Sequence, residues 1–172
     1  METVYTKAAE HQLAKGTLLT TLPTLGKEWR VTHDFKPTEY LTTWTNSIQL
    51  TIGGFNGQYG DRIAFIHPSS PKLGKMVIVS AVNGEKSYSK STAQPTVGAW
   101  TTITISQTLE GGKYMFRITI GGQEVHAVEN TQPQEFKGVK VYASNPQSET
   151  QPGSIRNLMV ESKVQVRSGP QL

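Results

Sequence analysis

The chain has 172 residues, of which 35% are hydrophobic, and it carries a formal net charge of +4. It contains no cysteine, which excludes disulfides and thiolate metal sites, and it has no stretch of the roughly 20 apolar residues that a transmembrane helix needs. The basic residues are scattered singly, so the charge does not indicate a nucleic-acid-binding protein, and the length suits a single domain.

The beginning of the chain contains its only helix-like stretch, Lys7–Leu13, which is short and lacks a capping residue. We therefore expect residues 1–15 to form an N-terminal arm. A β-sandwich domain is expected over residues 16–162. Residues 163–172 end in a glycine- and proline-containing segment that is typical of a C-terminal tail or linker.

Eleven segments with sheet periodicity follow the arm. In the clearest of them, Trp29, Val31, His33 and Phe35 alternate with polar or charged residues, which is typical of a half-buried strand. The predicted strands cover residues 17–22, 28–36, 47–52, 61–67, 75–82, 86–90, 99–107, 113–120, 123–130, 136–143 and 154–161.

Glycine, asparagine and proline separate these segments. Asn83-Gly84 predicts a two-residue hairpin turn after residues 75–82, and Gly121-Gly122 predicts another after residues 113–120. We expect the prolines to lie between strands, because proline cannot donate a backbone hydrogen bond to a sheet. No internal repeat is evident, which argues against propellers and solenoids.

The same alternation predicts the hydrophobic core. Burial of each large apolar side chain contributes about 1.5–3 kcal/mol, which offsets much of the ordering entropy without disulfides. The expected core residues are Trp29, Val31, Phe35, Ile48, Leu50, Ile63, Phe65, Val77, Val79, Ile103, Ile105, Tyr114, Phe116, Ile118, Val139, Val141, Leu158 and Val160. The chain is therefore predicted to be all-β.

Three stretches resemble the concanavalin A-like jelly-roll superfamily, including its laminin G-like, pentraxin-like and galectin-like branches. They are Gly26–Pro37, Val97–Gln107 and Gly153–Val160, and they occur in the order found in that superfamily. The resemblance spans about residues 16–161 and implies an antiparallel two-sheet jelly-roll β-sandwich of about eleven strands. These motifs are structural, so they bear on the fold more than on the function.

The functional motifs of the superfamily branches are mostly missing. Of the galectin sugar site, only His67 and Asn83 have a counterpart. The Glu-x-Asp-x-x-Glu arrangement of the glucanase branch does not occur. The chain has only two aspartates, Asp34 and Asp61, so a calcium site is not indicated.

The stretch Gly53–His67 is the densest mixture of glycine, aromatic and charged residues in the chain, and it could form a ligand-binding rim. Tyr59 could stack on a sugar ring while Asp61 and Arg62 supply directional hydrogen bonds. The alternative is structural, with Asp61 capping a turn and pairing with Arg62 or another cation at the surface.

Two other places could contribute to binding. Asn83 and Glu85 lie on a hairpin that would extend the rim, although turn chemistry alone explains Asn83-Gly84. Trp44 lies between threonine-rich neighbours, where it is either an exposed anchor for sugar or protein or a hydrophobic plug. His33 lies on an apolar strand face, where a core role is more common than a functional one.

The sequence contains no signature of catalysis or of a cofactor. The four histidines lack zinc-ligand spacing, no Gly-x-Ser-x-Gly nucleophile motif occurs, and the glycine pairs do not form a phosphate loop. We predict no catalytic residue, no metal and no cofactor. The candidate ligand-binding residues are Trp44, Tyr59, Asp61, Arg62, His67, Asn83 and Glu85.

The sequence favours a non-enzymatic recognition module that binds glycan in a lectin-like manner, acidic glycans included, in an extracellular or secreted setting. Two alternatives stay open. One is a structural or adhesion domain that binds protein partners or itself. The other is a glucanase-type glycoside hydrolase, which would need two carboxylates about 5–10 Å apart. We expect a glycan or protein ligand and homo-oligomers as one form of assembly, with no nucleic acid and no membrane insertion.

Overall fold

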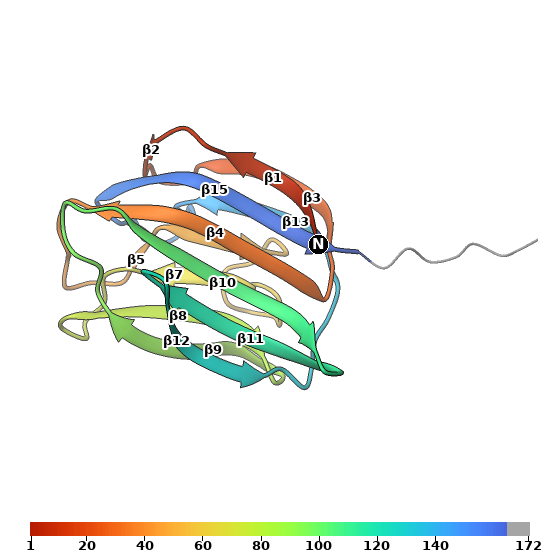
Figure 1. The fold of residues 1–172 in the computed structure, drawn as a ribbon. Helices are drawn as coiled ribbons and strands as arrows, with labels where there is room; N and C mark the ends of the chain where they lie inside the picture. The colour runs from red at the N-terminus through yellow and green to blue at the C-terminus, as the bar shows by residue number, and fades with distance from the viewer. Residues whose placement is uncertain (165–172) are drawn as a thin grey trace, which may run out of the picture.

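The computed structural model describes residues 1–164, which form two antiparallel sheets packed face to face (Figure 1). The seven-stranded sheet has the order β1-β15-β4-β10-β11-β12, with β2 also pairing with β15, and the six-stranded sheet has the order β3-β13-β6-β7-β8-β9. A short parallel pair, β14 with β5, forms a separate two-stranded sheet beside β7. The predicted all-β sandwich is confirmed.

The strands of the seven-stranded sheet are β1 (Glu2–Lys7), β2 (His11–Gln12), β4 (Glu28–Pro37), β10 (Thr101–Glu110), β11 (Lys113–Ile120), β12 (Gln123–Glu129) and β15 (Gly153–Lys163). Those of the six-stranded sheet are β3 (Leu18–Leu25), β6 (Ile48–Thr51), β7 (Ala64–His67), β8 (Lys75–Val82), β9 (Glu85–Ala93) and β13 (Phe136–Ala143). The parallel pair consists of β5 (Thr45–Asn46) and β14 (Glu149–Thr150). Most of the expected C-terminal tail, residues 165–172, lies outside the described residues.

All eleven predicted segments contain a strand, and both predicted hairpins form. Asn83 and Gly84 have φ angles of 57° and 77° and connect β8 to β9, and Gly121 and Gly122 have φ angles of 60° and 80° and connect β11 to β12. Two successive positive φ angles define the hairpin turn whose twist matches that of the flanking strands. The turn residues therefore set these two connections.

Two features differ from the sequence-based expectations. Residues 1–15, expected as an arm, supply β1 and β2, which pair with β15. Pro23 lies inside β3 and Pro37 is the last residue of β4, so the expectation that the prolines fall between strands is wrong at these two positions. The sheet tolerates Pro23 because β3 is an edge strand that pairs only with β13, and an edge strand leaves some backbone groups without a ladder partner.

The main core lies between the two sheets. Seventeen of the eighteen predicted core residues are buried, and Tyr114 is only partly buried. Three of the buried residues, Phe65, Val77 and Val79, form a separate cluster on the opposite face of the six-stranded sheet. Strands β7 and β8 are thus buried on both faces, and the second face lies beneath loops that build the pocket described next.

Candidate functional site

The outer face of the six-stranded sheet carries a pocket of about 430 Å³. We call it the outer-face pocket. It is lined by Trp44, Phe55, Arg62, His67, Val77, Val79, Ser89, Gln147, Ser148 and Glu149. These residues come from strands β7, β8 and β9, from the β14 segment, and from the loops that precede β5, β7 and β14.

The floor of the pocket is apolar because alternate residues of β7 and β8 point away from the main core. Phe65 is opposite Val79 in the strand register, and His67 is opposite Val77. The neighbouring residues Ala64 and Ile66 belong to the main core instead. Because successive side chains of a strand point to opposite faces, one face of β7 and β8 belongs to the main core and the other forms the floor of the pocket.

Arg62 lies against this floor with its guanidinium packed on two aromatic rings that also contact each other. Its Cζ atom is 4.6 Å from the centroid of the Phe55 ring and 4.3 Å from that of Phe65. Its Nε donates a hydrogen bond of 3.1 Å to the carbonyl oxygen of Phe55. Burial lowers the pKa of Arg62, although the nearby charge of Asp61 opposes this shift. The guanidinium is therefore a cation held in a poorly hydrated place.

Asp61 stabilises the loop that carries Phe55. Its carboxylate accepts hydrogen bonds from the backbone amides of Gly54, Gly57 and Gln58, at 3.2, 2.7 and 2.8 Å. The side chain is buried. Asp61 therefore has the capping role of the structural alternative, but it forms no ion pair with Arg62 among the described residues.

His67 presents one ring nitrogen toward the pocket. Its Nδ1 lies 2.7 Å from the carbonyl oxygen of Thr45, and a carbonyl can only accept, so Nδ1 carries the proton. Burial lowers the pKa of His67 to about 4, with the charge of Arg62 adding to this effect and the bond to Thr45 opposing it. At neutral pH the ring is uncharged, and Nε2 is a hydrogen-bond acceptor.

Trp44 covers one side of the pocket and remains accessible. Its side chain is 45% exposed, and its ring centroid lies 4.7 Å from that of His67. Next to it, Thr43 donates a hydrogen bond of 2.8 Å to the carboxylate of Glu149. The Trp44 side chain is therefore accessible to solvent at the pocket.

A buried amide network positions the rim residues 147–149. The Asn145 side chain accepts hydrogen bonds from the backbone amides of Gln147 and Ser148, at 3.0 and 2.7 Å. Its own Nδ2 donates to Gln49, and its backbone amide donates to Asn46. Asn145 thus holds the loop of residues 147–149 against strand β6, which carries Gln49.

The pocket brings together three of the seven predicted site residues, Trp44, Arg62 and His67. The other four do not line it. The Tyr59 ring packs 6.2 Å from Phe136, and its hydroxyl donates to the Gln132 carbonyl. Asp61 caps its own loop, as described above.

The hairpin residues are placed by turn chemistry. The Asn83 side chain accepts hydrogen bonds from the backbone and hydroxyl of Thr131. Glu85 is exposed at the start of β9 and is not among the lining residues. The left-handed backbone of Asn83 and Gly84 is that of a hairpin turn, which is the structural role that the sequence also allowed for them.

Sequence reasoning missed Phe55, the two floor valines as pocket residues, Ser89, and residues 147–149. Phe55 lies within the stretch Gly53–His67 that the sequence singled out, so a signal for it existed. Residues 147–149 have no local signal, because they reach the pocket through the Asn145 network.

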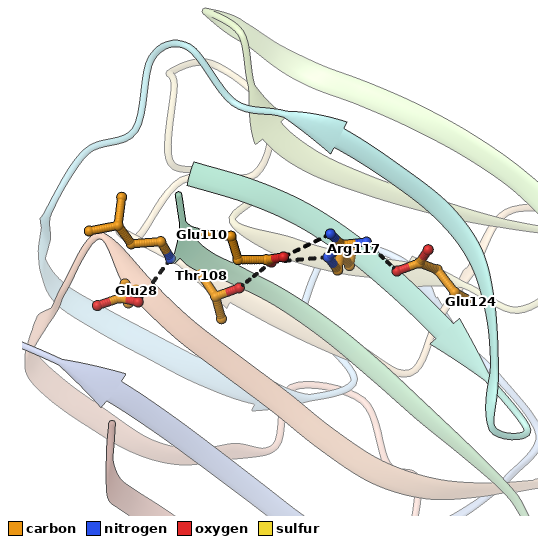
Figure 2. Close-up of polar contacts among 6 residues, drawn as sticks. Glu28, Thr108, Glu110, Arg117 and Glu124 are labelled. Carbon is orange, nitrogen blue, oxygen red and sulfur yellow. Dashed lines mark hydrogen bonds and ion pairs between the residues drawn. The ribbon is translucent and has the colours of Figure 1, made fainter. Parts of the chain in front are cut away.

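A second charged cluster lies on the seven-stranded sheet, at the end of β10, in the middle of β11 and at the start of β12. Figure 2 shows Arg117 bridging Glu110 and Glu124, with ion-pair distances of 2.8 and 2.6 Å. Thr108 donates a further hydrogen bond to Glu110, and the Leu109 backbone amide donates to Glu28. The Arg117 side chain is committed to cross-strand pairing, so this cluster is structural.

Metal and membrane features can be assessed over residues 1–164. Within that range no group of three or more histidine, aspartate or glutamate side chains is placed to hold a metal ion. The same range contains no helix of the length and apolar character that crosses a bilayer.

No family model and no curated protein sequence matches this chain. Its fold, however, is similar to solved structures. One is the native heptameric SAP-like pentraxin from Limulus polyphemus, with 15% identity over 90% of this chain and 76% of that chain and a TM-score of 0.60. Another is the K499G mutant of NanB sialidase from Streptococcus pneumoniae, with 12% identity over 96% of this chain and 27% of that chain and a TM-score of 0.63.

A third similar structure is domain 4 of AbnA, a GH43 extracellular arabinanase from Geobacillus stearothermophilus, in complex with arabinotriose. It has 16% identity over 81% of this chain and 64% of that chain, with a TM-score of 0.55. The chain thus spans less than two thirds of the arabinanase domain structure and of the sialidase. At these identities the similarity concerns the fold alone, which is the antiparallel two-sheet jelly-roll β-sandwich expected from the sequence.

Proposed function

We propose that the protein is a non-enzymatic, lectin-like recognition module that binds glycan in the outer-face pocket. The observation that carries the proposal is the exposed Trp44 ring beside an apolar floor, with polar atoms of Arg62 and His67 at the same opening. Ligand sites combine a largely apolar lining with a few directed polar groups.

A sugar ring matches this combination. Its C–H face can stack on an aromatic ring such as Trp44, while its hydroxyls both donate and accept hydrogen bonds. The terminal nitrogens of Arg62 are donors, and Nε2 of His67 and the Glu149 carboxylate are acceptors. The pocket therefore supplies both halves of the hydrogen bonding that a hydroxylated ring requires.

One structural neighbour supports the assignment to glycan. Domain 4 of the arabinanase is described in complex with arabinotriose. That arabinanase is also described as extracellular, which supports the expected extracellular or secreted setting for this chain. The pentraxin is described as heptameric, which supports a homo-oligomer as one form of assembly.

The two other functions have less support. Hydrolysis by the usual pair of acids needs a second carboxylate across the cleft, and Glu149 is the only carboxylate among the described residues that line the pocket. A protein-binding or adhesion role would use the same exposed Trp44 as an anchor. It becomes the favoured function if glycans do not bind.

A glycan-array screen of the purified protein tests the proposal. It is run with calcium and with a chelator, at low and moderate salt. We expect saturable binding to a defined sugar class that survives chelation. Loss of binding on chelation would show that a metal is required, and the absence of binding under all conditions would refute the glycan assignment.

A further inference from the structure

We infer that the glycan bound in the outer-face pocket carries an anionic group, a carboxylate or a sulfate, that pairs with the guanidinium of Arg62. This inference rests on the proposed function and specifies the class of glycan.

Arg62 is a buried cation whose hydrogen-bonding capacity is mostly unused. The residue is only 8% exposed, yet it lines the pocket. A guanidinium has five N–H donors, and among the described residues only the Nε donor has an acceptor, the carbonyl of Phe55. The two terminal nitrogens are left for a ligand.

No carboxylate of the described residues forms an ion pair with this cation, although the charge of Asp61 lies close enough to oppose the lowering of its pKa. The adjacent Asp61 accepts three backbone amides of its own loop, and no ion pair joins the two side chains. Buried charges in proteins are normally paired, because an unpaired charge loses its hydration without compensation. The terminal nitrogens of Arg62 are not among the buried atoms that lack a partner, so they face the pocket, where a bound anion can supply a counter-charge.

The surroundings of Arg62 favour a strong interaction with an anion. Phe55 and Phe65 pack against the guanidinium, at 4.6 and 4.3 Å, so little side-chain entropy remains to be lost. The desolvation that lowers the pKa of Arg62 also strengthens its attraction for an opposite charge. The planar fork of donors matches the paired oxygens of a carboxylate or a sulfate.

Glu149 lies on the rim of the same pocket and carries a negative charge, opposite to that of Arg62. A variant at Glu149 therefore controls for the effect of changing any charge at the pocket. Its side chain is exposed and already accepts a hydrogen bond from Thr43. Water and salt screen a charge in such a position. Glu149 therefore weakens the binding of an anionic ligand only slightly. Glu149→Gln removes the negative charge but keeps a side-chain oxygen that accepts a hydrogen bond from a sugar hydroxyl, so this variant is expected to bind the anionic ligand more tightly.

The test pairs each acidic glycan on the array with a neutralised form. Sialylated and uronic-acid glycans are printed beside their methyl esters, and sulfated glycans beside their desulfated forms. Hits are then titrated by calorimetry against the wild type, Arg62→Gln and Glu149→Gln, after circular dichroism and urea unfolding show that both variants fold.

We expect the hits to be acidic glycans and the neutralised forms to bind about 10- to 100-fold more weakly, the size of a lost charge-assisted bidentate contact. Loss on esterification identifies a carboxylate, and loss on desulfation identifies a sulfate. Arg62→Gln should lose the preference for the charged form, and Glu149→Gln should bind it somewhat more tightly.

Equal binding of charged and neutralised glycans would overturn the inference and leave the lectin-like function standing. An unchanged preference in a folded Arg62→Gln variant would overturn it as well. The comparison between forms of the ligand on the wild type does not depend on any variant folding. Failure of every glycan to bind would instead refute the proposed function.

Discussion

Acidification should destabilise this protein through His33, which is buried in the main core. Its exposed fraction is 1%, and neither ring nitrogen has a hydrogen-bond partner among the described residues. Burial lowers its pKa from 6.5 to about 4, with the nearby Asp34 charge acting in the opposite direction. The folded protein thus keeps the ring neutral at a pH where the unfolded chain protonates it.

The sign follows from proton binding. Below pH 6.5 the unfolded state binds a proton that the folded state excludes, so the free energy of unfolding falls as the pH falls toward 4. One such histidine costs about 2 kcal/mol of stability at pH 5 and about 3 kcal/mol below pH 4. The pKa of His67 is also lowered to about 4, so His67 lowers the free energy of unfolding further over the same range of pH.

Urea unfolding of the wild type and of His33→Leu at pH 7, 6, 5 and 4 measures this effect. Leucine removes two unpartnered polar atoms, so the variant should be as stable as the wild type at pH 7 or more stable. Between pH 6.5 and 4 the variant should lose less stability than the wild type, although not none, because His67, His11 and His126, whose pKa values are also lowered by burial, remain. Equal losses in the two proteins would refute the assignment to His33.

Three smaller predictions concern the loop at the pocket and the opposite sheet. Asp61→Asn should lower the free energy of unfolding by about 1–3 kcal/mol in urea titrations. The single oxygen of the asparagine amide cannot replace a carboxylate that accepts hydrogen bonds from three backbone amides. Stability equal to that of the wild type would contradict this prediction. Gly54→Ala should also destabilise the loop, since its Cβ would lie 2.5 Å from Asp61 Oδ2. The matched change Gly57→Ala in the same loop controls for crowding, because its Cβ would lie 3.6 Å from that oxygen, an ordinary contact distance. Arg117→Met should cause a small fall in the urea midpoint that becomes smaller in high salt, because salt screens an exposed ion-pair network. A fall of the same size in high salt would show that the loss is one of packing instead.

The fold could be predicted because its local signals agree with one another. Alternation placed eleven strands, and the two hairpin turns followed from Asn83-Gly84 and Gly121-Gly122. Strand β1 was missed because it is a polar edge strand, Glu2–Lys7, with no fully buried residue. Its position depends on pairing with β15 at the other end of the chain.

The site could be predicted only in part, because its residues meet through tertiary contacts. Trp44, Arg62 and His67 stood out by residue type. Tyr59 looked equally suitable, and only the fold shows that its ring packs on Phe136. Alternation identified Phe65 as buried but could not show that it belongs to the second face of the sheet, since both faces of β7 are apolar.

The most direct test of glycan binding in the outer-face pocket compares two tryptophans. Trp44 lies at the pocket, while Trp100 is a partly buried tryptophan in contact with Lys36 and Arg156, outside the pocket lining. Calorimetric titration of the best array ligand into Trp44→Ala should show affinity reduced at least about tenfold, the loss of roughly 1.4 kcal/mol of stacking. Trp100→Ala should bind like the wild type. Unchanged affinity in a folded Trp44→Ala variant would contradict binding at this pocket.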